Sequence, residues 1–295
     1  MKVFIAVLAV ASFVYAEDAQ EVPSGNTAYG YLKNIGIPLG EKIRAAEEAI
    51  LSKQRIVGGL PAGLGQYPYQ AGLLSSLIGT QGTGVCGGSL LTASRVLTAA
   101  HCWFDGNIQA WKIEVVLGSV TLFSGGQRID SSVVAMHPNW TPLLARNDVA
   151  VIYLPSPHSS TTSNNVATIG LPIGAELDND WVGSSAIASG FGMTSDDGGI
   201  TFDQTLKQVR LVVIANGICS IAFPIVFHST NICTSGIGGI GVCGGDSGGP
   251  LVAKSDGRDV LIGISSFVST QGCEAGFPSA YARVTSFVPF INQHL

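Results

Sequence analysis

The chain has 295 residues, of which 46% are hydrophobic and 12% charged, and its formal net charge is −5 at pH 7. From Ile56 onward there are 14 acidic and 9 basic residues, so this part of the chain carries all of the net charge. This balance argues against proteins that bind nucleic acid or anionic membrane surfaces through basic patches.

The N-terminus predicts a secretory signal peptide. Met1 and Lys2 precede an apolar run over residues 3–13, and the small residue Ala16 follows. The run is shorter than the ~20 residues that a membrane-spanning helix needs. We therefore expect cleavage after Ala16 and a secreted, extracellular protein, in which the six cysteines can form disulfides.

Residues 17–55 differ in composition from the rest of the chain. Asp, Glu and Lys cluster there and cysteine is absent. Ile43, Ala46, Ile50 and Leu51 recur at helical spacing, which predicts a short amphipathic helix over residues 41–54. The pattern leaves open whether this helix is an exposed leader or has a specific role.

The remainder predicts an all-β protein, because short Val/Ile/Leu-rich runs alternate with polar turns and many of the 38 glycines. The expected strands are residues 89–97, 112–117, 149–154, 186–191, 207–213, 251–253, 261–267 and 279–284. Longer helical periodicity occurs over 285–294, where Phe287, Phe290 and Ile291 could pack on the body. The Ser/Thr/Pro/Asn-rich stretch 155–165 is the best candidate linker.

Three short motifs carry the chemistry: residues 98–102 (TAAHC), 147–150 (NDVA) and 245–250 (GDSGGP). They place His101, Asp148 and Ser247 in the order that chymotrypsin-like enzymes use. A serine hydroxyl needs an adjacent base to become a good nucleophile, and a histidine can supply it. On these motifs, residues 56–295 resemble the trypsin/chymotrypsin family of serine endopeptidases. The uncharged pocket and the long propeptide described below resemble those of the digestive chymotrypsin-like enzymes of insect larvae.

The resemblance implies two six-stranded antiparallel β-barrels followed by a short C-terminal helix. The first barrel would span 56–154 and the second 166–295, joined by the linker 155–165. His101 and Asp148 would come from the first barrel and Ser247 from the second. The active site would then lie in the cleft between them.

The resemblance also implies a role for each site residue. His101 would be the general base, Asp148 would hold its tautomer, and Ser247 would be the nucleophile. The backbone N–H groups of Gly245 and Ser247 would form the oxyanion hole. Ser266 matches the supporting serine that contacts the catalytic aspartate. The other histidines stand in no motif.

An activation junction is implied at Arg55, which precedes the sequence IVGG at 56–59. Residues 17–55 would then be a propeptide. Cleavage after Arg55 would create an ammonium group at Ile56, which would pair with Asp246 and order the loop that carries Ser247.

Six cysteines allow fifteen pairings, and the sequence itself does not choose among them. A zinc site is disfavoured because no pair has C-x-x-C spacing. The family resemblance implies the disulfides Cys86–Cys102, Cys219–Cys233 and Cys243–Cys273.

The implied substrate pocket is uncharged. Gly241 lies at its floor, where trypsin-like enzymes have aspartate, and Ser279 is a small residue beside it. Ser266, Phe267 and Val268 would form a wall. This predicts a chymotrypsin-like preference for apolar residues. Val268 stands where the family usually has glycine and would narrow the pocket, so an elastase-like or broad collagenolytic specificity is the alternative.

We expect neither a cofactor nor a metal ion. The pattern G-x-G-x-x-G over 236–241 leads into the serine motif rather than into a helix, so it is not a dinucleotide-binding fingerprint. The stretch 118–129 matches the family's calcium loop but has no acidic residue. Asn139 begins a glycosylation sequon.

The expected partners are protein or peptide substrates, an activating trypsin-like protease and protein protease inhibitors, and the enzyme is expected to be a monomer. Three lysines against six arginines from Ile56 onward suit an alkaline digestive lumen, since arginine stays charged at high pH. A non-catalytic homologue would have lost Ser247 or His101, and a cascade protease would carry a trypsin-like pocket, so both alternatives are disfavoured.

Overall fold

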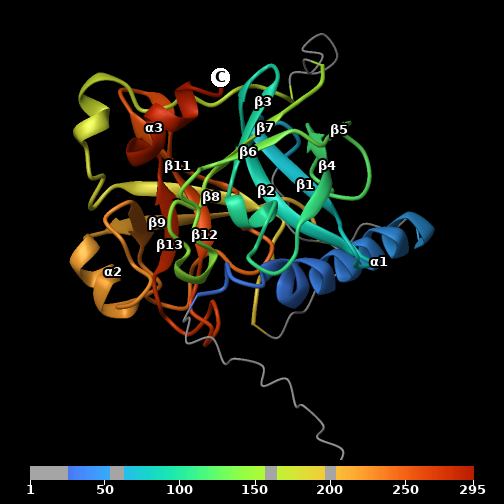
Figure 1. The fold of residues 1–295 in the computed structure, drawn as a ribbon, viewed down its shortest axis with the longest axis horizontal. Coiled ribbons are helices and arrows are strands. Elements are labelled where there is room, and N and C mark those ends of the chain that lie inside the picture. Colours follow the sequence, from blue (N-terminus) through green and yellow to red (C-terminus); the bar gives the residue numbers. More distant parts are fainter. Residues whose placement is uncertain (1–25, 54–62, 157–164, 197–203) are drawn as a thin grey trace, which may run out of the picture.

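A computed structural model describes residues 26–53, 63–156, 165–196 and 204–295. The predicted signal peptide, the predicted activation junction at Arg55–Ile56 and most of the expected linker lie outside these residues, as do the side chains of Ile50 and Leu51. Figure 1 shows two groups of strands side by side, with a helix from the N-terminal region lying across one end of the first group.

The first group is a seven-stranded antiparallel sheet in the order β5-β4-β1-β2-β3-β7-β6. The edge strands β5 and β6 are separated in the chain by only Ser132 and Val133. The single segment 127–136 therefore supplies both edge strands of the sheet, which curls towards a barrel. Because Ser132 and Val133 divide this segment into β5 and β6, seven strands are found where six were expected. The strands are β1 (Gln70–Leu77), β2 (Thr83–Thr92), β3 (Arg95–Thr98), β4 (Ala110–Leu117), β5 (Gln127–Ser131), β6 (Val134–Met136) and β7 (Ala150–Tyr153).

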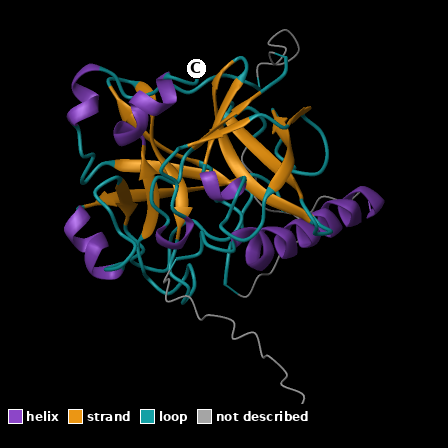
Figure 2. Cartoon of the chain, viewed as in Figure 1, coloured by secondary structure: helices purple, strands orange, loops and turns teal. Residues whose placement is uncertain are grey.

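The second group is a closed six-stranded barrel in the order β10-β13-β12-β11-β8-β9 (Figure 2). All its pairs are antiparallel, which confirms the expected all-β class and the second barrel. Its strands are β8 (Ser185–Gly190), β9 (Lys207–Ile214), β10 (Asn231–Thr234), β11 (Pro250–Ser255), β12 (Arg258–Phe267) and β13 (Ser279–Arg283).

Apolar side chains fill both units because branched and aromatic residues fit the pleated inner faces. Leu73, Leu97 and Ile113 are fully buried in the first sheet, and Ile232 and Tyr281 in the second. The C-terminal helix α3 (Val284–Asn292) confirms the expected helix, and it buries Phe287, Phe290 and Ile291 as predicted.

The N-terminal helix is longer than predicted. The π-helical turn η1 (Leu32–Gly36) leads into α1 (Ile37–Lys53), so the helix begins nine residues before residue 41. Pro38 lies inside this continuous helix and has no N–H to donate to the preceding turn, and the widened π-helical turn comes directly before it. Among the described helices, none is long and apolar enough to cross a membrane.

Other differences are local. Residues 89–97 are not one strand, because a turn at Ala93 and Ser94 divides them between β2 and β3. The short helix α2 (Asn216–Ala222) was not predicted, since two turns are too short to show periodicity. Strands β1, β5, β6 and β10 were also missed. Short 3₁₀ turns complete the fold: η2 (Ala100–Cys102), η3 (Pro142–Leu144) and η4 (Gly174–Asp178).

Candidate active site

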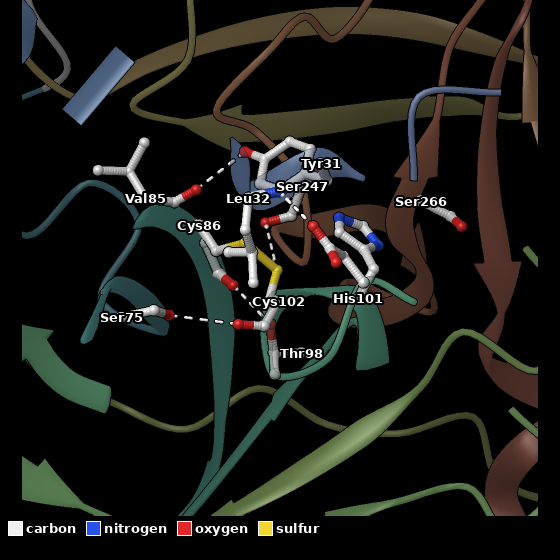
Figure 3. The surroundings of a disulfide bond; sticks show 12 residues. Tyr31, Leu32, Ser75, Val85, Cys86, Thr98, His101, Cys102, Ser247 and Ser266 are labelled. Carbon is white, nitrogen blue, oxygen red and sulfur yellow. Dashed lines mark hydrogen bonds between the residues drawn. A yellow bond between two sulfur atoms is a disulfide. The ribbon is translucent and has the colours of Figure 1, made fainter. Parts of the chain in front are cut away.

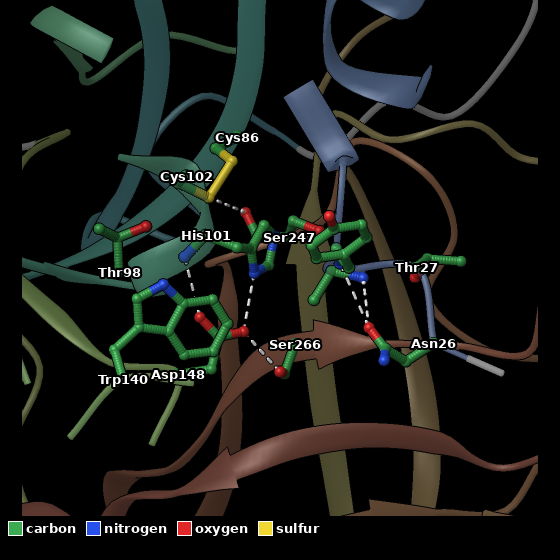
Figure 4. Close-up of polar contacts among 12 residues, drawn as sticks. Asn26, Thr27, Cys86, Thr98, His101, Cys102, Trp140, Asp148, Ser247 and Ser266 are labelled. Atoms are coloured by element: carbon green, nitrogen blue, oxygen red, sulfur yellow. Dashed lines mark hydrogen bonds and ion pairs between the residues drawn. A yellow bond between two sulfur atoms is a disulfide. The ribbon is translucent and has the colours of Figure 1, made fainter. Parts of the chain in front are cut away.

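His101 and Asp148 form a buried hydrogen-bonded pair. His101 lies in η2, directly after β3, and Asp148 lies two residues before β7, so the pairing of β3 with β7 brings them together. Nδ1 of His101 is 2.7 Å from Oδ2 of Asp148, and the backbone N–H of His101 donates to Oδ1 at 3.0 Å. The carboxylate therefore fixes both the ring and the backbone of the histidine (Figure 4).

Asn147 holds Asp148 in place. It has a φ of +58°, which asparagine tolerates better than most residues. Its side-chain amide donates to the carbonyl of Asn139 at 2.8 Å. This positioning role was not predicted, although the motif at 147–150 contained the residue.

Ser266 reaches Asp148 from the second barrel. The register of β12 against β13 shifts between Ser265 and Phe267, which leaves Ser266 at a β-bulge. Its hydroxyl donates to Oδ2 of Asp148 at 2.6 Å. The buried carboxylate thus accepts hydrogen bonds from both barrels, and these offset its loss of hydration.

Ser247 lies on a tight loop just before β11. Gly248 has a φ of +79°, and a Cβ at this position would collide with the hydroxyl of Thr98. The carbonyl of Ser247 accepts from the N–H of Gly87 at 2.7 Å, and the N–H of Gly248 donates to Ser265 at 2.7 Å. The loop is therefore tied to both strand groups.

The link from serine to histidine is not made in this state. Nε2 of His101 is buried and has no hydrogen-bond partner among the described residues. Ser247 lies close by but is only 7% exposed, and the ring of Tyr31 lies beside both residues, in an edge contact with the ring of His101 (Figure 3). The structure thus brings the three predicted residues together, but the hydrogen bond between Ser247 and Nε2 of His101 is not formed.

The three disulfides join the expected pairs, Cys86–Cys102, Cys219–Cys233 and Cys243–Cys273. Within the described residues, two groups could in principle hold a metal ion: His101 with the first of these disulfides, and Asp196 with the last. Disulfide sulfurs are not thiolates, so neither group is a normal metal-ligand set.

Asp246 is a carboxylate without a cationic partner in the described part of the chain. Its oxygens accept from the N–H groups of Gly192 at 2.9 Å and Cys243 at 3.0 Å. Burial raises its pKa from 3.8 to about 6, although these two hydrogen bonds act in the opposite direction. A cavity of about 210 Å³ borders Asp246, Met193 and Glu274.

The predicted pocket residues do not all border one cavity. Ser266, Phe267 and Val268 line a pocket of about 20 Å³, and no charged side chain lines it. Gly241 instead borders the larger cavity beside Asp246. Ser279 lies against Gly241, where its hydroxyl accepts from the N–H of Val242 at 3.2 Å.

Two barrel-like units that bring a histidine–aspartate pair and a serine to one site are the architecture of chymotrypsin-like serine endopeptidases. The family model described as Trypsin matches residues 56–291, and the chain belongs to this family. The chain is accordingly a serine endopeptidase, and its substrates are proteins or peptides.

The relatives agree with this assignment. The chain is 39% identical to the protein named "Collagenase" from Hypoderma lineatum, over 83% of this chain and 88% of that protein. It is 37% identical to "Brachyurin" from Leptuca pugilator, over 80% of this chain and 97% of that protein. A solved structure of HL collagenase superposes with a TM-score of 0.71 at 36% identity, covering 81% of this chain and 98% of that chain.

Proposed function

We propose that the chain is the secreted precursor of a digestive endopeptidase that cleaves after apolar residues, with His101, Asp148 and Ser247 as its catalytic triad. The observation that carries this proposal is the buried chain of hydrogen bonds from His101 and Ser266 to Asp148, beside Ser247 on its glycine-rich loop. The gut lumen is the proposed site of action.

In this mechanism, Oγ of Ser247 attacks the carbonyl carbon of the scissile peptide bond while Nε2 of His101 takes its proton. Asp148 accepts from Nδ1 and stabilises the imidazolium that forms. The imidazolium then protonates the leaving amine, and an acyl-enzyme remains. A water molecule, deprotonated by His101, attacks the acyl group and releases the acid and the free serine.

The backbone N–H groups of Gly245 and Ser247 are the proposed oxyanion hole. Gly245 has a φ of +98°, a conformation that glycine adopts readily and that other residues strain to reach. Removing one such donor typically lowers turnover by about 10²–10³. The mutation of Gly245 to any larger residue would disturb the hole.

Activation is proposed to follow cleavage after Arg55 by a trypsin-like protease. The new ammonium group of Ile56 would pair with Asp246, whose partly buried carboxylate has no cation beside it among the described residues. The adjoining cavity of about 210 Å³ supports this proposal, because an ion pair can be buried there with little rearrangement. Protein protease inhibitors would bind the mature site.

Chymotrypsin-like specificity is the first proposal for the pocket, since its lining is uncharged in the described residues. An elastase-like or collagenolytic specificity is the second. Two observations favour it: Val268 lies in the pocket wall, and the relatives bear the names "Collagenase" and "Brachyurin". A single methylene in a hydrophobic pocket changes discrimination by about 1–3 kcal/mol, and valine adds three carbons relative to glycine, so Val268 should favour small apolar residues over large aromatic ones.

The test is hydrolysis of short peptides by the secreted protein before and after mild trypsin treatment. The panel varies only the residue before the scissile bond: Phe, Tyr, Leu, Ala, Val or Arg. Activity led by Phe and Tyr supports the first specificity, and activity led by Leu or Ala supports the second. No hydrolysis of any member, despite a verified Ile56 terminus, would contradict the proposal and favour a non-catalytic protein.

A further inference from the structure

We propose that residues 26–49 are a built-in inhibitor that fills the substrate site and remains bound after cleavage at Arg55, so that its release is a second step of activation. This inference rests on the proposed role of residues 17–55 as a propeptide. It goes beyond that role, because in the activation mechanism proposed above cleavage after Arg55 is sufficient to produce the active enzyme.

Tyr31 is the central contact. Its ring lies edge-on against His101 with centroids 4.8 Å apart, and its hydroxyl donates to the carbonyl of Val85 at 2.8 Å (Figure 3). Burial raises the pKa of Tyr31 above its usual range. Tyr31 therefore contacts the proposed general base and lines the same pocket as the proposed nucleophile Ser247, where a substrate would have to bind.

The substrate pocket is also closed by this segment. The hydroxyl of Thr27 accepts from the N–H of Val268 at 3.2 Å. Thr27, Tyr31 and Ile35 line the pocket together with its predicted wall, and about 20 Å³ remains. That space holds about one water molecule, so no apolar side chain of a substrate can enter.

Asp105 anchors the segment to the first sheet. This aspartate is fully buried, and its Oδ2 accepts from the N–H of Leu32 at 2.8 Å. Its carbonyl accepts from the N–H of Gly30 at 3.1 Å. These bonds fix the backbone on both sides of Tyr31 and so set the direction of its ring.

Helix α1 continues the contact along β2. Gly36 and Gly40 lie one helical turn apart, and a Cβ at Gly40 would collide with the carbonyl of Thr83. A Cβ at Gly36 would lie 3.5 Å from the Cα of Gly84. Gly40 therefore allows the helix to lie against the strand backbone, whereas a Cβ at Gly36 would make ordinary contact with it. Leu39 of the same helix occupies the space beside Gly245.

A second anchor lies far from the catalytic residues along the helix. Glu47 is only 3% exposed, although a carboxylate on a surface helix is normally solvated. Its Oε1 accepts from the N–H of Leu122 at 2.6 Å, and its Oε2 from the hydroxyl of Ser124 at 2.9 Å. Both of its oxygens also accept from the N–H of Phe123 at 3.1 Å. The loop at residues 122–124 is thus a carboxylate-binding site on the peptidase domain.

Cleavage at Arg55 removes none of these contacts, because each of them joins a residue of 26–49 to the peptidase domain and none involves the cleaved bond. A helix of this length is marginal when it is isolated in water, so the free segment must refold to rebind. Lys33, Lys42 and Arg44 are exposed on it. A trypsin-like activator would cut a released, unfolded segment at these residues, which would make activation irreversible.

The first experiment uses the full precursor, cut briefly with immobilised trypsin that is then filtered off. Mass analysis verifies the Ile56 terminus and an intact released segment. We expect activity on the best apolar peptide to rise on dilution after cutting is complete, and to fall when a synthetic peptide of residues 26–49 is added. Tyr31→Ala should weaken this inhibition by about 100-fold, and Glu47→Gln by about tenfold.

The matched control is Glu48→Gln, which removes the same charge at the neighbouring exposed position and should leave inhibition unchanged. A scrambled peptide should not inhibit. Activity that follows the extent of cleavage at every dilution, together with no inhibition at about 100 μM peptide, would overturn the inference. Equal inhibition by the scrambled peptide would overturn it as well.

A binding measurement separates this inference from the proposed function. Fluorescent peptide 26–49 is titrated into the cut Ser247→Ala protein, freed of its own segment. Binding that Glu47→Gln weakens supports the inference even if the cut enzyme hydrolyses no peptide, in which case only the proposed function fails. An active cut enzyme whose Ser247→Ala form binds no peptide leaves the proposed function intact and refutes the inhibitor.

Discussion

The ring of Tyr31 lies against the imidazole of His101, with centroids 4.8 Å apart and planes inclined at 64°. A residue of the proposed propeptide therefore contacts the proposed general base. This contact excludes substrate from His101, and Nε2 of the imidazole has no hydrogen-bond partner among the described residues. The uncleaved chain thus has a covered site in which the hydrogen-bonded pair of His101 and Asp148 is already formed.

Loss of a triad side chain should abolish most of the activity. We expect Ser247→Ala and His101→Ala to lower kcat of the cut enzyme by roughly 10⁴ or more, because the nucleophile or its base is removed. Steady-state hydrolysis of the best panel peptide measures the effect. His228→Ala, at an exposed histidine outside the site, is the matched control and should retain full activity. An active Ser247→Ala enzyme would refute the assignment.

Ser266 should act through Asp148. Ser266→Ala removes the 2.6 Å hydrogen bond to Oδ2, and the carboxylate becomes a stronger acceptor for His101. The imidazolium is then favoured, so the acid limb of the profile of kcat against pH should move to higher pH. We expect kcat at neutral pH to fall about tenfold, with little change in KM. An unchanged pH profile would reduce Ser266 to a packing residue.

Val268 should control the choice between large and small apolar residues. Val268→Gly is expected to raise kcat/KM for Phe and Tyr relative to Ala by roughly 10–200-fold, as one side chain in a pocket wall can. Val268→Ala should give an intermediate ratio. Competition between two peptides in one reaction measures the ratio directly. The same ratio in the parent enzyme, Val268→Gly and Val268→Ala would show that residues other than Val268 limit the size of the side chain that the pocket accepts.

Asp246 should make the precursor less stable as pH rises. Its pKa is raised by burial to about 6 in the folded chain and is 3.8 for an ordinary aspartate. The folded precursor therefore holds the proton more tightly, and this stabilisation is present below about pH 3.8 and is lost as pH rises through about 6. Relative to Asp246→Asn, the precursor should lose up to about 3 kcal/mol of unfolding free energy between pH 4 and 7.

Urea unfolding at the two pH values measures this difference. Cleavage at Arg55 should reverse it, because the ammonium of Ile56 favours the ionised carboxylate. Equal pH dependence in the precursor and Asp246→Asn would contradict the account of this residue.

The activation site has a simple test. Arg55→Gln removes the residue that a trypsin-like protease recognises at the junction, so the chain should remain inactive after brief treatment. N-terminal sequencing reports whether Ile56 is exposed, and peptide hydrolysis reports activity. Full activity of this variant after treatment would show that activation takes place elsewhere in the chain.

Much of the site was predictable because its motifs report local chemistry. The histidine, aspartate and serine stand in short sequences whose residue types leave few alternatives, and the structure places them together. The strand predictions succeeded where branched residues form continuous runs. They failed at β1, where glycine and serine interrupt the run, and at β10, which has only four residues.

The covering segment could not be predicted in the same way. Tyr31 stands in no motif, and its partners are 54 residues or more away in the sequence. Glu47 on an amphipathic helix indicates an exposed carboxylate, and only the loop at Leu122–Ser124 makes its burial favourable. Gly40 weakens a helix by local propensity, and the reason for a glycine there becomes visible only when the helix lies against β2.

The most direct test of the central claim is labelling with a fluorophosphonate, which reacts with a serine activated by a neighbouring base. The precursor is treated in parallel with the cut enzyme and the cut His101→Ala variant, both freed of the segment 26–49, and the modified peptide is identified by mass. The account predicts stoichiometric labelling at Ser247 in the cut enzyme, little in the precursor and none in the variant. Labelling at another serine, or peptide hydrolysis by an enzyme whose Ser247 stays unmodified, would contradict it.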